Sequence, residues 1–169
     1  RRHRLDAHGL GQRHGGAGLS PAPAVRRLGP GDIAGFRAMN RLFAHAFEDP
    51  ESYAQAPPGD RWAGDWLANP NHIALIAEAG DAAVGALAAY VLPKFEQARS
   101  EIYIYDLAVL ESARRQGVAT ALIDALRAIA REIGAWTIFV QADIVPEDEP
   151  ARRLYRKLAC EEITALHFD

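Results

Sequence analysis

The segment from Asp106 to Thr120 holds the residues whose types and spacing point most clearly to chemistry. It reads Asp-Leu-Ala-Val-Leu-Glu-Ser-Ala-Arg-Arg-Gln-Gly-Val-Ala-Thr. This pattern predicts a strand that ends at Val109, a short polar loop, and a long helix that begins near Gly117. The first four N–H groups of a helix have no partner within it, and the helix dipole favours an anion there. Gly117 has no Cβ, so a ligand can approach the backbone closely.

Two arginines in this loop favour a phosphate ligand. Arg114 and Arg115 add charged donors to the backbone N–H groups, and together these groups would form a cradle for a pyrophosphate. The segment lacks both the Gly-rich fingerprint of dinucleotide-binding folds and the Gly-Lys-Ser/Thr ending of nucleoside triphosphate-binding loops. The alternative is an ordinary strand-to-helix turn with two solvated arginines, and spacing alone does not decide between the two.

Tyr155 is a candidate proton donor. It lies in a predicted helix over Pro150–Leu158, and a phenol with a pKa of about 10 can give a proton to a leaving thiolate with a pKa of about 8.5. The alternative is a buried aromatic side chain whose hydroxyl has a structural partner.

Two motifs resemble those of the GNAT acetyltransferases. The loop Arg114–Ala119 is similar to their Gln/Arg-x-x-Gly-x-Gly/Ala signature, which binds the pyrophosphate of acetyl-CoA. The segment Ala151–Tyr155 is similar to their Ala-x-x-Leu-Tyr helix, whose tyrosine points at the thioester sulfur. Two positions depart from the pattern: Asp148 stands where many relatives have an asparagine that touches pantetheine, and Ala159 replaces a glycine. The first departure weakens that one contact, and the second changes only the turn after the helix.

The resemblance implies a fold and a co-substrate. The expected fold is α/β (α+β): a single three-layer GNAT domain with a central mixed, mostly antiparallel, splayed β-sheet flanked by helices. The co-substrate is acetyl-CoA, with the strand Leu107–Val109 along its pantetheine arm. The residues expected to bind it are Leu107, Ala108, Val109, Arg114, Arg115, Gln116, Gly117, Val118, Ala119, Thr120, Ala151 and Tyr155.

Further segments narrow the resemblance: Val84–Gln97 with Ser100, Glu101–Asp106, Val140–Asp143 and His167–Asp169. They are similar to the aminoglycoside 3-N-acetyltransferases of the gentamicin and fortimicin type. This subfamily implies direct acetyl transfer, in a ternary complex, to the 3-amino group of the 2-deoxystreptamine ring. Such a transfer gives antibiotic resistance, because a neutral amide replaces an ammonium that the drug uses against ribosomal RNA phosphates.

Acidic residues gather in the loops that flank the acceptor cleft of a GNAT fold. Glu48, Asp49 and Glu51 follow the first predicted helix, and a second acidic group follows the strand Trp136–Val140. Clustered carboxylates would attract and orient a polycationic aminoglycoside, whereas the alternative is a solvated acidic rim. The residues expected to bind the substrate are Glu48, Asp49, Tyr105, Asp106, Asp143, Glu147 and Asp148.

Within this resemblance, Asp106 and Tyr155 are the expected catalytic residues. Asp106 precedes the pantetheine-pairing residues and would take the proton of the acceptor ammonium, directly or through water. Its alternatives are a structural carboxylate and one that only binds the ammonium. Backbone N–H groups around Leu107 and Ala108 would polarise the thioester carbonyl. Cys160 lies beside two glutamates that disfavour a thiolate, so a covalent acetyl carrier is not expected. The histidines show no metal-ligand spacing, so no metal is expected.

The remaining pattern predicts alternating helices and strands. Asp32 would cap a helix from Ile33 to Phe47, and Glu48–Asp60 is expected to be an ordered loop. Tyr103 and Tyr105 would share one strand face, opposite Ile102 and Ile104. The other predicted elements are helices over Arg61–Leu67 and Val118–Ile133 and strands over Ala24–Leu28, His72–Ala77, Ala82–Leu92, Ile102–Val109, Trp136–Val140 and Ile163–Phe168.

Composition and charge exclude several classes of protein. With 169 residues, 49% of them hydrophobic and 24% charged, the chain is long and apolar enough for one folded domain. The longest apolar stretch, Ala82–Leu92, is too short to cross a membrane, and one cysteine excludes a disulfide framework. The net charge is −3, but the first 20 residues carry +3, so the remainder carries −6. That remainder favours a cationic ligand over nucleic acid.

These observations give one domain and a short set of partners. Residues 1–23 are expected to be a disordered leader or a remnant of cloning, and residues 24–169 the GNAT acetyltransferase domain. The expected partners are an aminoglycoside and coenzyme A, without nucleic acid or membrane. A homodimer is one expected assembly, and the expected location is cytoplasmic. Two other functions stay open: a GNAT enzyme that acetylates another polyamine or amino sugar, and a non-catalytic acyl-CoA-binding module.

Overall fold

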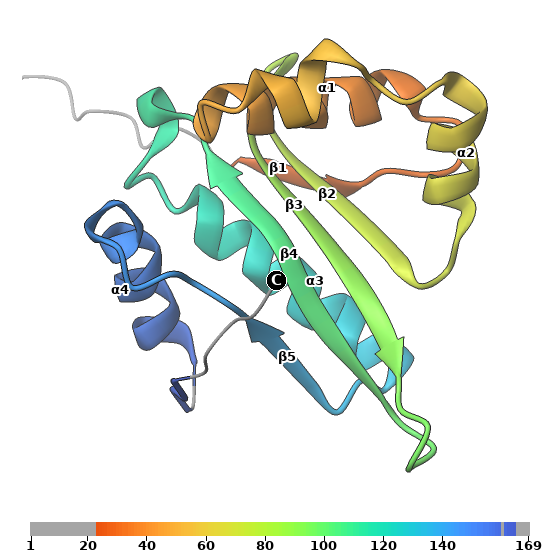
Figure 1. Cartoon of the computed structure of the whole chain (residues 1–169), viewed down its shortest axis with the longest axis vertical. Helices are drawn as coiled ribbons and strands as arrows, with labels where there is room; N and C mark the ends of the chain where they lie inside the picture. Colours follow the sequence, from red (N-terminus) through yellow and green to blue (C-terminus); the bar gives the residue numbers. More distant parts are fainter. Residues whose placement is uncertain (1–22, 160, 165–169) are drawn as a thin grey trace, which may run out of the picture.

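A mixed β-sheet with helices on both faces forms the centre of the computed structural model, which describes residues 23–159 and 161–164 (Figure 1). Its strand order follows the chain, and the first four strands pair antiparallel. The fifth pairs parallel to the fourth after a helical crossover. The strands are β1 (Ala24–Arg27), β2 (His72–Ala79), β3 (Ala82–Pro93), β4 (Ser100–Val109) and β5 (Thr137–Val140). The predicted fold class is confirmed.

The main helices begin and end close to the predicted positions. Asp32 caps the first, since its Oδ1 accepts a hydrogen bond from the backbone N–H of Gly35 at 2.8 Å. Gly134, with φ 69°, ends the third. The helices are α1 (Ile33–Ala46), α2 (Asp60–Ala68), α3 (Val118–Ile133) and α4 (Glu149–Leu158), with short turns η1 (Glu51–Gln55), η2 (Glu111–Ala113) and η3 (Pro146–Asp148).

The predicted loop after α1 and the predicted last strand both need correction, and several predicted segments lie outside the described residues. The expected loop Glu48–Asp60 contains a π-helical turn, η1, because the N–H of Ser52 binds the side chain of Asp49 at 3.0 Å. Of the predicted last strand, Ile163 and Thr164 are not in a strand, and the rest lies outside the described residues. Cys160, the segment His167–Asp169 and the predicted leader, apart from Pro23, also lie outside them.

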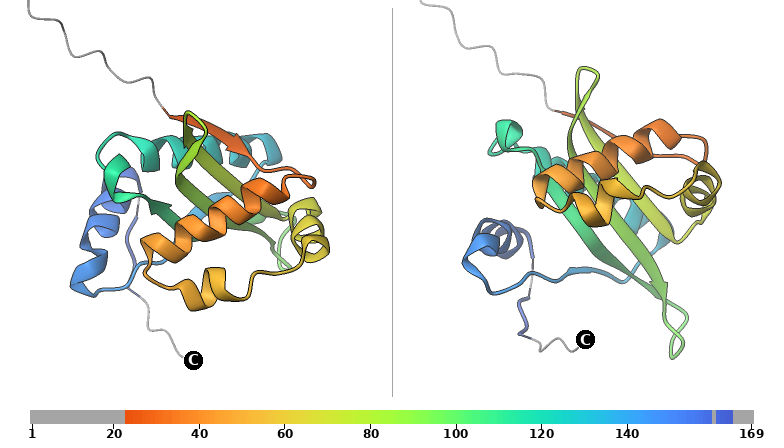
Figure 2. Two further views of the ribbon diagram at one scale, coloured as in Figure 1. Left: turned by 90° about the horizontal axis from the view of Figure 1, so that it is seen from above. Right: turned by 45° about the horizontal axis from the view of Figure 1, so that its top comes forward.

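The sheet separates two hydrophobic cores (Figure 2). On one face, Leu87, Ile102 and Ile104 pack with Leu122 and Leu126 of α3. On the other face, small strand residues such as Ala86 and Ala88 pack against Phe36 and other apolar side chains of α1 and α2. β2 and β3 each alternate their side chains between these two faces. The helices α1 and α2 therefore lie on the opposite face of the sheet from α3. No helix in the described part is both long enough and apolar enough to span a bilayer.

Two irregularities in β4 create room for a site. β5 is paired with β4 only as far as Ile104 and Val140, while β4 continues to Val109, so the two strands separate. Opposite β3, the register shifts because Ala88 faces Asp106 and Ala89 faces Ile104. Tyr105 is therefore the extra residue of a β-bulge. The bulge and the separation occur at the same place, directly before Leu107.

Candidate active site

Asp106 occupies the bulge of β4 and has an unusual environment for a carboxylate. It is half-buried, and its Oδ2 accepts a hydrogen bond from the Tyr53 hydroxyl at 2.9 Å. Burial raises the pKa of this carboxyl above its ordinary value, and the hydrogen bond from Tyr53 partly opposes that rise. Among residues 23–159 and 161–164, no lysine or arginine forms a salt bridge with it. A partly desolvated carboxylate of this kind is suited to receive a cation from a ligand.

Tyr155 approaches the same place from α4. Its ring packs against the core beneath α3, and burial raises the pKa of its phenol to about 12, with the negative charges of Asp148 and Asp106 adding to the rise. The phenol therefore keeps its proton at neutral pH. Because both carboxylates act on this hydroxyl, the structure brings Asp106, Asp148 and Tyr155 into one electrostatic neighbourhood.

The backbone of β4 presents free groups beside Asp106. The N–H of Leu110 donates to the Val84 carbonyl of β3 at 2.9 Å. Since N–H directions alternate along a strand, the N–H of Ala108 also faces β3. The N–H groups of Leu107 and Val109 face the opening left by β5. These two residues, rather than Ala108, can donate to a ligand in that opening.

The N-terminus of α3 has the features of an anion site. Gly117 and Arg115 adopt positive φ angles of 81° and 61°, and no side chain caps the helix. The first bond within the helix is donated by Ala121, so the N–H groups of Val118, Ala119 and Thr120 have no helical acceptor. The predicted cradle therefore exists as a row of backbone donors at a helix start, which fits a pyrophosphate.

The side chains of this loop complete the cradle. Arg114 and Arg115 are exposed, and neither forms a salt bridge with a residue in the described part of the chain. Gln116 folds back, with its side-chain amide donating to the Ser112 carbonyl at 2.9 Å. It therefore braces the loop. Arg114 donates through Nε to the Val109 carbonyl at 3.4 Å, and both arginines are exposed, so a phosphate can reach their remaining N–H donors.

Gly85 of β3 sets the position of this helix start, and our sequence analysis missed it. A Cβ at Gly85 would lie 2.6 Å from Cγ1 of Val118 and 3.2 Å from Cδ1 of Leu122. Only glycine allows α3 to approach the sheet so closely here. A glycine inside an otherwise apolar strand was the available signal.

The predicted acidic residues divide into two groups. Asp148 accepts from the backbone N–H of Asp143 at 3.1 Å, which fixes the turn after β5, and Glu147 lies in the same turn, η3. Arg152 of α4 holds this turn by donating to the carbonyls of Asp143 and Val145, the latter at 2.7 Å. Of these residues, Asp148 acts on the Tyr155 phenol through its charge.

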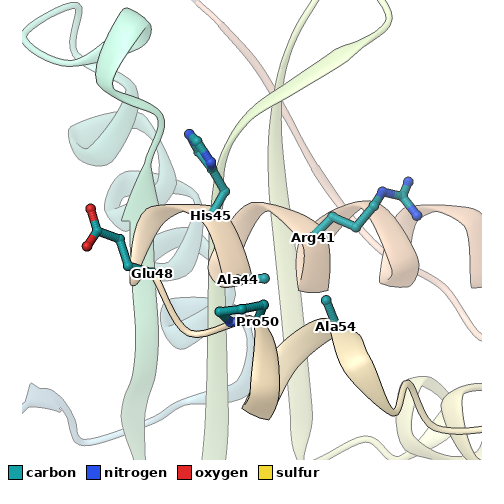
Figure 3. A pocket seen from close by; sticks show the side chains of 6 residues that line it. All are labelled: Arg41, Ala44, His45, Glu48, Pro50 and Ala54. Carbon is teal, nitrogen blue, oxygen red and sulfur yellow. The ribbon is translucent and has the colours of Figure 1, made fainter.

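The other acidic group follows α1. The Ser52 side chain and backbone N–H hold the pKa of Asp49 below its ordinary value, and its charge reaches the Tyr53 phenol. Glu48, with φ 55°, instead lines an open depression of about 580 Å³ between α1 and η1 (Figure 3). Arg41 and His45 line that depression too. Glu48 therefore lines a depression that does not include Asp106.

A row of aromatic side chains crosses the sheet beside Asp106, and our sequence analysis did not find it. The strand register places His72 opposite Tyr90, Tyr90 opposite Tyr103, and Tyr103 opposite Phe139. The rings of His72 and Tyr90 lie 5.2 Å apart and those of Tyr103 and Phe139 5.0 Å apart, and Tyr105 connects the two pairs by edge-to-face contacts with Tyr90 and Tyr103 at 5.6 Å and 5.9 Å. Tyr105 is 60% exposed and Phe139 37%. The row therefore offers exposed aromatic surface next to a carboxylate.

Residues 35–159 match the acetyltransferase (GNAT) family. The chain belongs to this family. The match covers most of the described residues and includes β4, the α3 loop and α4. GNAT acetyltransferases use acetyl-CoA, and the cradle at α3 has the donors that its pyrophosphate requires. Among the described residues, no three histidine, cysteine or acidic side chains are grouped so that they could hold a metal ion.

Similar proteins with solved structures include two aminoglycoside acetyltransferases from uncultured soil metagenomic samples. The first is 47% identical, with a TM-score of 0.84, and the alignment covers 86% of this chain and 95% of that one. The second, solved in complex with sisomicin, is 28% identical with a TM-score of 0.77, covering 89% and 98%.

Curated relatives give a different acceptor. The L-2,4-diaminobutyric acid acetyltransferase of Shouchella clausii (strain KSM-K16) is 32% identical over 85 residues, which are 50% of this chain and 45% of that protein. The corresponding enzyme of Marinococcus halophilus is 27% identical over 85 residues, 50% of this chain and 46% of that protein. The aligned part therefore spans about half the length of these two relatives.

Proposed function

We propose that this protein transfers the acetyl group of acetyl-CoA to the 3-amino group of the 2-deoxystreptamine ring of aminoglycosides. The observation that carries the proposal is the half-buried carboxylate of Asp106, which has no cationic partner in the described part of the chain and shares its surroundings with the Tyr155 phenol. The position of the acetylated amine follows from the subfamily resemblance of the sequence. The acceptor class follows from that resemblance and from the two similar aminoglycoside acetyltransferases.

The residues around Asp106 suit an amino sugar. Ammonium groups would pair with the carboxylates of Asp106 and Asp148. A sugar ring also has an apolar C–H face, and the exposed rings of Tyr105 and Phe139 offer it a surface on the same side of the site. A linear polyamine would use the carboxylates but would gain less from the exposed aromatic rings.

Acetyl-CoA would lie in the opening where β4 and β5 separate. Acetyl-CoA supplies the acetyl thioester, held by the backbone donors at Val118, Ala119 and Thr120 and by the two arginines of the α3 loop. Along β4, the N–H of Val109 faces this opening and can donate to an amide carbonyl of the pantetheine arm, whereas the Val109 carbonyl accepts from Nε of Arg114 at 3.4 Å. The N–H of Leu107 faces the same opening and polarises the carbonyl oxygen of the acetyl thioester.

Proton movements fall to Asp106 and Tyr155. Asp106 takes the proton of the acceptor ammonium, and the freed nitrogen forms a bond to the acetyl carbon while the carbon–sulfur bond breaks. Tyr155 donates its proton to the departing sulfur, which leaves as the coenzyme A thiol. The acylated nitrogen then gives its second proton, through water, to the Tyr155 phenolate and becomes a neutral amide, and Asp106 releases its proton to solvent. The cationic acceptor offsets the negative charges of Asp106 and Asp148, which raise the pKa of Tyr155. Acceptor binding therefore makes the phenol a better acid at the moment when the thiolate leaves.

A small diamino acid is the second candidate acceptor, because of the diaminobutyric acid acetyltransferases that match half of the chain. Such an acceptor carries a carboxylate as well as ammonium groups. Asp106 and Asp148 would repel that carboxylate, since like charges in a partly buried site are unfavourable. The charge of the site therefore favours the polycationic sugar.

An acceptor panel tests the proposal. Release of the coenzyme A thiol would be measured with gentamicin, fortimicin, sisomicin, kanamycin, spermidine and L-2,4-diaminobutyric acid, and NMR would locate the acetyl group on each product. We expect turnover with gentamicin, fortimicin and sisomicin, with the acetyl group on the 3-amino nitrogen. An acetyl group on another nitrogen would refute the position. Turnover with spermidine or diaminobutyric acid alone would refute the acceptor class, and binding of coenzyme A without any turnover would favour a binding module.

A further inference from the structure

The hydrogen bond between Tyr53 and Asp106 joins two parts of the chain that are 53 residues apart. Tyr53 lies in η1, in the connection between α1 and α2, and its hydroxyl donates to Oδ2 of Asp106 at 2.9 Å. This bond links the α1–α2 connection to β4, and no motif in the sequence marks it. The inference drawn from it rests on the proposed role of Asp106 as the proton acceptor.

The Tyr53 ring is fixed by packing. It contacts Phe43 and Phe47 of the α1 C-terminus, at ring distances of 5.7 Å and 5.8 Å, and those two rings stack on each other at 5.6 Å. Asp49 holds the turn from the other side, since its Oδ1 accepts from the N–H of Ser52. The hydroxyl therefore has a defined position, and its bond to Asp106 costs little further side-chain entropy.

The charges around Asp106 make Tyr53 a permanent donor. The titratable groups that face the carboxylate are phenols: Tyr53 from η1, Tyr103 from β4 itself and Tyr155 from α4. Burial and the charge of Asp106 raise the pKa of Tyr53 well above its ordinary value, so this phenol does not ionise near neutrality. Tyr103 donates to Gln141 instead, at 3.0 Å. Of these three phenols, Tyr53 is the one bonded to Asp106.

We propose that Tyr53 is a positioning residue for Asp106: its hydroxyl holds Oδ2, favours the ionised carboxylate and leaves Oδ1 to receive the proton of the acceptor. The same bond ties the α1–α2 connection to β4 and so sets one wall of the acceptor site. Loss of the hydroxyl leaves the carboxylate half-buried without its donor. Asp106 then stays protonated to higher pH and is less able to act as a base.

The experiment compares Tyr53→Phe with Phe47→Leu. The first variant keeps the ring and removes only the hydroxyl, whereas the second disturbs the same aromatic cluster and keeps the hydroxyl. Two measurements are made on each: the pH profile of kcat/KM with gentamicin, and the pKa of Asp106 in the free enzyme, read from the ¹³C carboxyl resonance that Asp106→Asn removes. The second readout needs no turnover.

We expect Tyr53→Phe to move the carboxyl resonance and the acidic limb of kcat/KM to higher pH. Its kcat/KM at neutral pH should fall about tenfold, the loss typical of a hydrogen bond to a charged group. In Phe47→Leu, the acidic limb of kcat/KM should stay at the same pH as in wild type. If the Asp106 pKa is the same in wild type and Tyr53→Phe, or if Phe47→Leu shifts it equally, the positioning role is refuted. If wild type acetylates no amine while the resonance shifts as expected, the proposed function fails and the Tyr53–Asp106 link stands.

Discussion

The two halves of the site are built in different ways. The acetyl-CoA half is one continuous segment, Arg114–Thr120, in which backbone N–H groups at the start of α3 do most of the work. The acceptor half collects side chains from η1, β4, the turn after β5 and α4. Local sequence sets the conformation of the first, although Gly85 of β3 sets its distance from the sheet, whereas the second exists only when distant elements pack together. The first half therefore suits a ligand common to a whole family, and the second can change with the acceptor.

The largest effect is expected at Tyr155, where the two halves meet. Tyr155→Phe removes the proton donor to the departing sulfur, so kcat should fall by about 10²–10⁴, the usual contribution of a positioned acid. The affinity for acetyl-CoA, measured by calorimetry, should not change. Tyr103→Phe is the matched control, because it removes another half-buried phenol whose pKa is also raised. An equal loss of kcat in both variants would contradict a specific role for Tyr155.

Gly117→Val tests the acetyl-CoA half by itself. A β-branched residue at φ 81° is strained, and the N–H groups of the cradle must shift. We expect acetyl-CoA to bind about tenfold to a hundredfold more weakly, corresponding to about 1–3 kcal/mol of strain, with the KM for the acceptor unchanged. Gly134→Val carries similar strain, at φ 69°, at the opposite end of α3. Gly134→Val should lower thermal stability about as much as Gly117→Val does, but it should leave the affinity for acetyl-CoA unchanged.

Tyr105→Ala tests the aromatic row of the acceptor half. The loss of one exposed ring should raise the KM for gentamicin about threefold to tenfold, from ring contacts worth about 0.5–1.5 kcal/mol. The KM for acetyl-CoA should stay the same. Phe95→Ala, which removes a fully exposed ring in the β3–β4 connection, is the control and should have no effect. A KM for gentamicin that does not change in Tyr105→Ala would exclude the row from acceptor binding.

The smallest effect is a gain in stability at the catalytic carboxylate. The folded-state pKa of Asp106 is raised by burial, so its ionisation above that pKa disfavours the folded state. Asp106→Asn should therefore raise the free energy of unfolding at neutral pH by about 0.5–1 kcal/mol, because solvent still screens the half-buried group. The gain should vanish below the ordinary aspartate pKa, where the wild-type side chain is neutral in both states. Glu132→Gln, exposed on α3, is the control in urea unfolding and should change the free energy of unfolding by less than about 0.5 kcal/mol.

The fold was predictable because its signals are local. Apolar residues at helical spacing gave α1 and α3, and the alternation of Ile102, Tyr103, Ile104 and Tyr105 gave the faces of β4. The π-helical turn η1 was missed, because it is short and lies within a loop rich in proline, where no hydrophobic period marks a helix. Gly85 was missed because its function is to admit Val118 from another element.

The sequence by itself determined the helix start at Gly117 with two arginines directly before it, and the family resemblance of these seven residues assigned them to a pyrophosphate. It also singled out Asp106 and Tyr155 through their motifs. Only the tertiary structure decided that Tyr53 binds Asp106, that Asp148 acts on Tyr155, and that aromatic side chains from four strands form one row. The physical reason is that backbone donors at a helix terminus follow from local conformation, whereas partners of a half-buried side chain follow from register and packing between segments far apart in the chain.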